Sequence, residues 1–228
     1  MPIKKTGKKG AIRLGPEGVA VENVPFSKDK AEIERYVARQ FVDHPPREET
    51  AYFKSKTLRQ NAEDDLDFTV DTAEGKKYLE LKEFAPLEMF GGDHANVPSM
   101  HNVGEMAKWY CQLVEESSAR YAGVPSIFLI TYSTERTLNL MACYRLVRSM
   151  LNREQLSLER VYYVSLHGRT GSSSLRLYPV AEAILSQEEE RRWGAMTATV
   201  PRIEDMRFHE NHVDIPVQTG RTIGRDES

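Results

Sequence analysis

The sequence predicts a single α/β domain in which helices flank a mixed central sheet. Helical patterns alternate with short apolar strand patterns along residues 27–200. Two of the strand patterns, residues 66–72 and 77–84, are joined by a short turn through Ala73-Glu74-Gly75 and predict a hairpin. With 228 residues, 40% of them hydrophobic, the chain is long enough to bury a core of its own.

The predicted elements follow one another as a helix, a weak strand, the hairpin, a long helix, a buried strand, a helix, two strands and a short helix. In that order they cover residues 28–43, 50–58, 66–84, 103–121, 126–132, 135–152, 160–166 with 174–180, and 181–193. The glycine-rich link of residues 167–171 suggests that the last two strands form another hairpin. Such an order predicts helices on the faces of a mixed sheet.

Spacing and end signals support the first helix and the hairpin. Ser27 is a suitable N-cap for the helix over 28–43, which His44-Pro45-Pro46 ends because proline cannot continue a helix. Ile33, Val37 and Phe41 recur on one face of this helix. Residues 50–58 show only a weak strand pattern.

The later elements are argued from burial patterns. The helix over 103–121 presents Met106, Tyr110 and Val114 at helical spacing, and Gly123 follows it. Residues 126–132 are apolar on both faces, as expected of a strand buried inside a sheet. The helix over 135–152 is expected to turn Leu138, Met141, Leu146, Val147 and Met150 inward.

Composition and periodicity divide the chain into three predicted parts: a flexible basic segment rich in Gly, Pro and Lys (1–26), a core domain (27–200) and a C-terminal extension in which the periodicity fades (201–228). The net charge of −3 means that any nucleic-acid binding must use a local patch. One candidate is the N-terminus, with five cations at Lys4, Lys5, Lys8, Lys9 and Arg13. A solvated arm explains these charges equally well.

Cysteine usage and hydropathy predict a cytoplasmic protein without a membrane span. Cys111 and Cys143 fall within helical patterns and are expected to be buried, reduced thiols. The residues after Met1 are basic and lack the apolar stretch of a secretory signal. The longest apolar run, residues 127–130, is too short to cross a bilayer.

The central hairpin carries an unusual set of charges. With a turn at residues 73–76, Thr72 faces Lys77 and Asp67 faces Lys82 across the strands. Glu80 shares a face with Lys82 and lies diagonally from Asp67, about 5–8 Å away at the Cβ atoms. The opposite face is apolar and is expected to pack against a helix through Phe68, Val70, Leu79 and Leu81.

Two carboxylates and a lysine on one face suggest phosphodiester chemistry. Paired carboxylates favour a hard divalent cation, with Mg²⁺ the default and Mn²⁺ a substitute. Such a cation polarises a phosphoryl oxygen and acidifies a bound water. The Lys82 ammonium can orient that water or stabilise the charge that develops in the transition state.

Asp67, followed 13 residues later by Glu80-Leu81-Lys82, resembles the PD-(D/E)xK nuclease superfamily. The resemblance covers residues 28–166 and implies a restriction-endonuclease-like fold and metal-dependent cleavage of nucleic acid, more often DNA. It also implies an acidic residue on the first helix, which Glu34 matches and for which Glu32 competes. Asp67 and Glu80 would then bind the metal with the Leu81 carbonyl as a further ligand. No proline precedes Asp67, so Asp65 is a rival for its role.

Other interpretations stay open at this point. The same fold can serve as a non-catalytic nucleic-acid-binding or assembly subunit, and the charges of the hairpin can be an accident of an exposed edge. A homodimer or a larger complex is compatible with the sequence. Weaker candidate ligands are His94 and His101 beside the hairpin, and His209 with His212 for zinc. Phosphate contacts from Lys54, Lys56 and Arg59 are weighed equally against a solvated strand.

Overall fold

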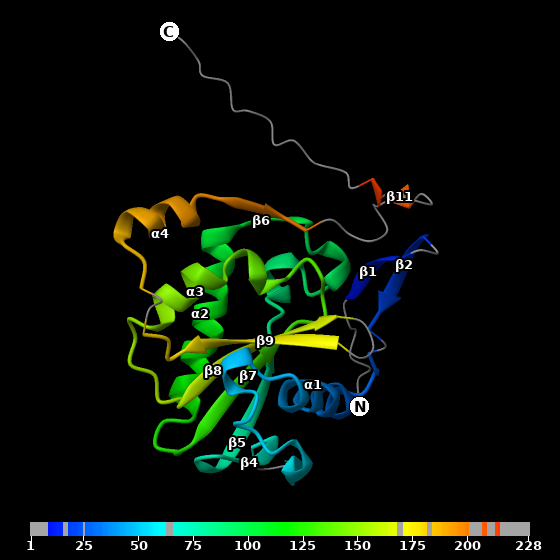
Figure 1. The fold of residues 1–228 in the computed structure, drawn as a ribbon. Coiled ribbons are helices and arrows are strands. Elements are labelled where there is room, and N and C mark those ends of the chain that lie inside the picture. Colours follow the sequence, from blue (N-terminus) through cyan, green and yellow to red (C-terminus); the bar gives the residue numbers. More distant parts are fainter. Residues whose placement is uncertain are drawn as a thin grey trace.

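The computed structural model has an α/β fold built on one six-stranded mixed sheet (Figure 1). It describes residues 9–15, 18–24, 26–62, 66–167, 171–181, 184–200, 207–208 and 213–214. The predicted fold class, α/β with a mixed central sheet flanked by helices, is confirmed at this level.

The sheet has the strand order β3-β4-β5-β7-β8-β9. Its strands are Arg59–Gln60 (β3), Phe68–Thr72 (β4), Gly75–Glu83 (β5), Ile127–Tyr132 (β7), Arg160–His167 (β8) and Gly171–Tyr178 (β9). The three central strands β5, β7 and β8 run parallel, and the other neighbours are antiparallel. Every residue of β7 is buried, as its two-sided apolar pattern predicts.

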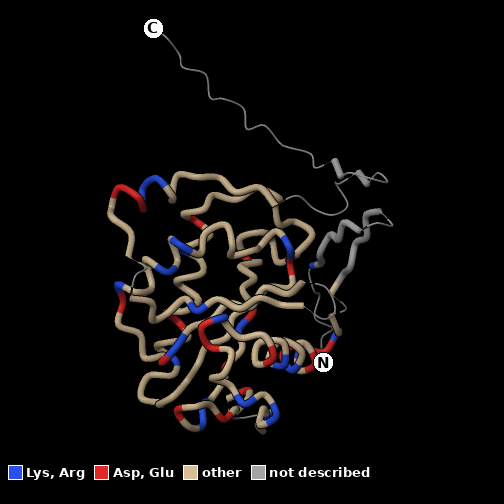
Figure 2. Tube along the Cα trace, viewed as in Figure 1, with Lys and Arg blue, Asp and Glu red and all other residues tan. Residues whose placement is uncertain are grey.

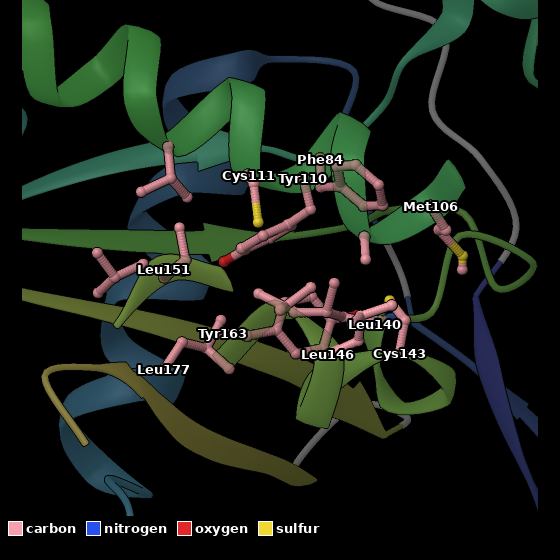
Figure 3. Packing of buried hydrophobic residues seen from close by; sticks show 14 of the residues in the cluster. Phe84, Met106, Tyr110, Cys111, Leu140, Cys143, Leu146, Leu151, Tyr163 and Leu177 are labelled. Atoms are coloured by element: carbon pink, nitrogen blue, oxygen red, sulfur yellow. Dashed lines mark hydrogen bonds between the residues drawn. The ribbon is translucent and has the colours of Figure 1, made fainter. Parts of the chain in front are cut away.

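Helices cover both faces of the sheet. Helix α1 (Lys30–Asp43) packs Ile33, Val37 and Phe41 on one face. Helices α2 (Val103–Arg120) and α3 (Tyr144–Leu151) cover the other face (Figure 1). Figure 3 shows the core beneath them, where Tyr110 and Leu151 pack near Tyr163 of β8. A short helix, α4 (Gln187–Gly194), packs outside α2 and α3.

Three small two-stranded sheets accompany the main one. They pair Gly10–Gly15 (β1) with Gly18–Asn23 (β2), Met100–Asn102 (β6) with Thr197–Thr199 (β10), and Arg207–Phe208 (β11) with Val213–Asp214 (β12). The segment predicted to be flexible and basic (1–26) therefore contains a two-stranded hairpin. Lys9, one of the cations weighed as a binding patch or a solvated arm, is buried, and its Nζ donates to the Ser133 carbonyl at 3.2 Å.

The N-cap prediction for the first helix is wrong by two residues. Asp29 is the cap, because its Oδ1 accepts from the backbone N–H of Ala31 at 2.8 Å and of Glu32 at 3.4 Å. Ser27 instead accepts from the Asp29 N–H and donates to the Glu32 carboxylate. The helix ends at Asp43, as predicted.

The predicted strand over residues 50–58 is also wrong. The segment contains the 3₁₀ turn Ser55–Thr57 (η2) and a single β-bridge between Phe53 and Thr72, and another 3₁₀ turn, Arg47–Glu49 (η1), precedes it. Local hydrogen bonds, such as that from the Thr57 N–H to the Lys54 carbonyl at 2.8 Å, replace a strand ladder. The buried Phe53 ring produces the strand-like pattern.

The helix predicted over 135–152 begins nine residues later, at Tyr144. The Glu135 carboxylate accepts from the N–H and hydroxyl of Thr137, and such local bonds compete with a helix. A 3₁₀ turn, Leu140–Ala142 (η5), follows and leaves Met141 exposed, where it was expected to be buried. Two more 3₁₀ turns, Leu87–Phe90 (η3) and His94–Asn96 (η4), lie in the loop after β5.

The hairpin predicted near the end of the core is confirmed, because β8 and β9 are antiparallel neighbours. The helix predicted over 181–193 is shorter and begins at Gln187, with Ser186 and Glu189 forming a capping box. Within the described residues no helix is both long and apolar enough to span a membrane. Lys4, Lys5, Lys8, Asp65, His209 and His212 lie outside the described residues.

Candidate active site

The turn between β4 and β5 sets the register of the predicted site. Thr72 pairs with Gly75, not with Lys77, so the connection has two residues where four were expected. Gly75 has φ +106°, a conformation that favours glycine, and the Thr72 hydroxyl donates to its carbonyl at 2.8 Å. The predicted register is therefore wrong by two residues. Because two is the period of a strand, every side chain keeps its predicted face.

The corrected register brings the two carboxylates closer than predicted. Phe68 pairs with Leu79, so Asp67, the next residue outward, lies beside Glu80 and not beside Lys82. Lys82 is two residues further along β5 and therefore lies on the same face as Glu80. The predicted apolar face is confirmed, since its four residues pack beneath α1: Phe68, Val70, Leu79 and Leu81.

The site lies just beyond the start of β4. Pairing between β4 and β5 begins at Phe68 and Leu79, so the residues of β5 after Leu79 have no strand partner on the β4 side. The backbone N–H groups of Tyr78 and Phe84 donate to β7-side carbonyls, so the backbone of Leu81 faces the opposite edge. There its N–H, which β4 does not reach, donates to Asp67 Oδ2 at 2.7 Å. In a strand the carbonyl of a residue points to the same edge as its N–H, so the Leu81 carbonyl also faces this open edge.

A polar pocket of about 340 Å³ opens at this edge. It brings together every residue that the sequence assigns to the site. These are Glu34, Asp67, Glu80, Leu81 and Lys82, and the lining is completed by Lys30, Glu83, Arg120 and Tyr121. Glu34 lies on α1 and is buried, whereas Glu32 is exposed, bonds to Ser27 and does not line the pocket. The structure therefore selects Glu34 over Glu32.

Burial and neighbouring charge act on Glu80 in the same direction. Desolvation raises the pKa of the Glu80 carboxyl, and the Asp67 carboxylate raises it further. The Tyr121 hydroxyl, Lys82 and Arg120 act against this rise. The pocket thus holds a carboxylate that is short of positive charge.

A lysine from α1 offsets part of the negative charge of the pocket. Lys30 Nζ lies 3.1 Å from Glu34 Oε1, with its own side chain two-thirds exposed. Partial burial lowers the pKa of Lys30, but Glu34, Asp67 and Glu80 together outweigh burial and raise it. Carboxylates from α1 and from the hairpin therefore act on one cation at the mouth of the pocket.

Sequence reasoning missed the two residues that enter the pocket from the end of α2. Tyr121 hydrogen-bonds to the Glu80 carboxylate, and both burial and that carboxylate raise the pKa of Tyr121. Arg120 lies with its guanidinium 5.4 Å from the Tyr121 ring centroid. A helix end carries no strand pattern, so nothing in the sequence connects these residues to a hairpin about 40 positions earlier.

The donor set fits a hard cation but is small. Asp67, Glu80 and the Leu81 carbonyl offer only oxygen, which is what Mg²⁺ prefers, and Mg²⁺ commonly keeps several waters. Among the described residues, no group of three or more His, Cys, Asp or Glu side chains is close enough to hold a metal ion. Glu34 therefore stands at the rim of any such site, not in a compact carboxylate triad.

The weaker candidates lie away from the pocket. His94 and His101 are buried and do not line it. Tyr110 belongs to the core, as expected, and its hydroxyl bonds to that of Thr131. Both cysteines are free and buried, as predicted, and burial raises the pKa of Cys143 to about 12.

Comparison with known proteins adds no relative. No family model, no curated protein and no solved structure matches the chain.

Proposed function

We propose that the pocket beside β4 and β5 is the active site of a metal-dependent nuclease that hydrolyses phosphodiester bonds, with DNA as the expected substrate. The observation that supports this most is the open edge of β5. There Asp67 lies beside Glu80, the Leu81 carbonyl faces the same opening, and Lys82 follows on the face of Glu80.

The carboxylates are suited to hold Mg²⁺, or Mn²⁺ in its place. Asp67 Oδ2 is engaged by the Leu81 N–H, which fixes the carboxylate and leaves Oδ1 for a cation. Glu80 is desolvated and repelled by Asp67, so its ionised form gains most from a cation. A bound Mg²⁺ would supply Lewis acidity toward a phosphoryl oxygen and a more acidic water.

Lys82 and Arg120 provide the positive charge that the reaction needs. Attack of a water oxygen on phosphorus forms a new P–O bond as that water loses a proton to solvent, and it breaks the bond to the leaving oxygen, which takes up a proton from another water. Negative charge on the phosphoryl oxygens must be balanced as this happens. The Lys82 ammonium can donate hydrogen bonds to the water and to one phosphoryl oxygen, and Arg120 lines the same pocket.

Element order supports the finer fold assignment, restriction-endonuclease-like, which belongs to the same proposal. Helix α1, the hairpin β4–β5, helix α2 and strand β7 follow one another, and the predicted acidic residue lies on the first of these helices. This matches the order that the PD-(D/E)xK resemblance implies for residues 28–166.

A non-catalytic nucleic-acid-binding or assembly subunit is the second candidate. It is favoured by the Lys30–Glu34 ion pair and by Arg120, which balance part of the acidic charge without a metal. Such a protein would keep the pocket and leave nucleic acid uncut.

Cleavage assays separate the two candidates. Purified protein is incubated with single- and double-stranded DNA and with RNA, in Mg²⁺, Mn²⁺ or EDTA, beside Lys82→Ala and Lys76→Ala. Lys76 is an exposed lysine of the same strand that does not line the pocket, so its removal is the matched control. We expect cleavage that requires metal, falls at least 100-fold in Lys82→Ala and persists in Lys76→Ala. Cleavage of no substrate, or cleavage in EDTA, would overturn the proposal.

A further inference from the structure

A group of exposed cations adjoins the pocket on the α1 side of the molecule. It consists of two arginines of α1 and three cations of the segment that follows: Arg35, Arg39, Lys54, Lys56 and Arg59. We call these five residues the basic ridge. Figure 2 shows blue segments both on α1 and on the chain below it, in the same part of the molecule.

Hydrogen bonds hold the two halves of the ridge together. Both Arg35 Nε and Arg35 NH2 donate to Gln60 Oε1, at 3.1 and 2.8 Å. Arg39 NH1 donates to the Ser55 carbonyl at 3.2 Å. The arginines of α1 therefore lie against the segment that carries the other three cations, so the ridge is one surface.

Ion pairing distinguishes the described cations of the ridge from other arginines on the same face of the sheet. Among the described residues, none of the five takes part in an ion pair, whereas Arg160 and Arg176, on the same face of the sheet, both pair with Glu49. Asp71 of β4 is an exposed acid that adjoins the ridge, since its backbone carbonyl accepts from the Lys54 N–H. The ridge therefore gathers five exposed cations on one surface of a chain whose net charge is −3.

The ridge leads directly to the pocket. Arg35 follows Glu34 on α1, and the backbone N–H of Asn61, next to Gln60, donates to the Asp67 carbonyl at 3.0 Å. From Glu34 to Arg39 the helix rises about 7.5 Å, roughly the axial rise of two nucleotides of one strand. A nucleic-acid backbone with one phosphate at Lys82 would therefore have its next phosphates over the ridge.

We infer that the basic ridge binds the phosphate backbone of a nucleic-acid duplex and places it over the pocket, an inference that takes its ligand from the proposed function. Duplex is favoured over single strand because single-strand binders use exposed aromatic rings for base stacking. The large exposed hydrophobic side chains of the described residues include no aromatic ring. Contacts to phosphates alone make the binding independent of sequence and strongly dependent on salt.

The test measures binding without cleavage. Affinity for a labelled 20-base-pair DNA duplex is measured in EDTA across 50–200 mM salt, for wild type and for Lys54→Gln/Lys56→Gln/Arg59→Gln. The control triple, Lys108→Gln/Arg191→Gln/Arg192→Gln, removes the same charge from exposed cations of α2 and α4, on the other face of the sheet. Circular dichroism and melting temperature check that both triples fold.

Counterion release sets the expected size of the effect. Each lost phosphate contact reduces the slope of log K against log salt by about 0.9, so three contacts reduce it by about 2.7. Between 50 and 200 mM salt, the factor by which affinity falls should then be about 40 times smaller for the ridge triple than for wild type. Asp71→Asn should bind more tightly than wild type, and the control triple should match wild type.

Other outcomes overturn the inference. A ridge triple with the wild-type slope, or a control triple with an equal loss, would show that the ridge is not the phosphate-binding surface. Ridge-dependent binding of single strands but not of duplexes would overturn the choice of ligand, and an RNA duplex of the same sequence tells which kind of duplex is bound. Because EDTA prevents metal-dependent cleavage, ridge-dependent binding by a protein that never cuts would retain this inference and reject the nuclease.

Discussion

Replacing Glu80 by glutamine should stabilise the protein when no divalent cation is present. Burial and the neighbouring Asp67 carboxylate raise the pKa of Glu80 above its ordinary value of 4.5, so the folded state holds the Glu80 proton more tightly than the unfolded state does. The resulting penalty is absent below pH 4.5, where the group is protonated in both states, and is complete once pH exceeds the raised pKa. Glutamine keeps the shape and can still accept the Tyr121 hydrogen bond.

The register of β4 and β5 allows the stabilisation by Glu80→Gln to be estimated. Opposed strand positions place the Cβ atoms of Asp67 and Glu80 about 5 Å apart, and like charges at that separation repel by about 3 kcal/mol at an effective dielectric constant of about 20. Lys82 and Arg120 offset part of this, so we expect Glu80→Gln to raise the free energy of unfolding by about 1 kcal/mol. For a chain of this length that corresponds to a rise in melting temperature of about 2–4 °C.

The assay is thermal unfolding in EDTA at pH 4.0 and pH 7.5, with Glu88→Gln, an exposed glutamate, as the control. The gain should appear at pH 7.5 only. Adding 10 mM Mg²⁺ should raise the melting temperature of wild type by about 3–5 °C, taking a dissociation constant of about 1 mM, and leave Glu80→Gln nearly unchanged. If Glu80→Gln melts at or below the wild-type temperature at pH 7.5 in EDTA, the two carboxylates are not in conflict and the reasoning is refuted.

Three further substitutions test the geometry of the site and of the fold. Tyr121→Phe removes the hydrogen bond that favours ionised Glu80, so the acidic limb of the pH–rate profile of cleavage should move to higher pH, and an unmoved limb would contradict that contact. Phe41→Ala empties a fully buried position and should cost about 3–5 kcal/mol in urea unfolding, with a loss below about 1 kcal/mol arguing against the α1 packing. Gly104→Ala should lower the melting temperature, although alanine ordinarily strengthens a helix, because the new Cβ would lie 2.7 Å from the Gly194 carbonyl oxygen. A stabilised Gly104→Ala protein would mean that α2 and α4 do not approach as described.

The local pattern of apolar residues was sufficient to predict an element where burial alone determines its type and bounds. Residues 127–132 form a strand buried throughout, and residues 103–120 form a helix, because their apolar spacing has a single period. Pattern failed where side chains bond locally. Glu135 bonds to Thr137 and delays the helix to Tyr144, and the buried Phe53 gives a strand signal to a segment of 3₁₀ turns. Whether these contacts form depends on the tertiary position of the segment, and the spacing of apolar residues carries no information about that position.

The sequence by itself determined which face of the hairpin is charged. Because side chains alternate with a period of two, Glu80 and Lys82 lie on one face of the strand and Leu79 and Leu81 lie on the other. An error of two residues in register cannot change these faces. Only the tertiary structure decided which charge lies beside Asp67, because a glycine turn fixes the register. It also chose Glu34 over Glu32 and brought Arg120 and Tyr121 to the pocket, since helix packing on both faces of the sheet joins residues that are distant along the chain.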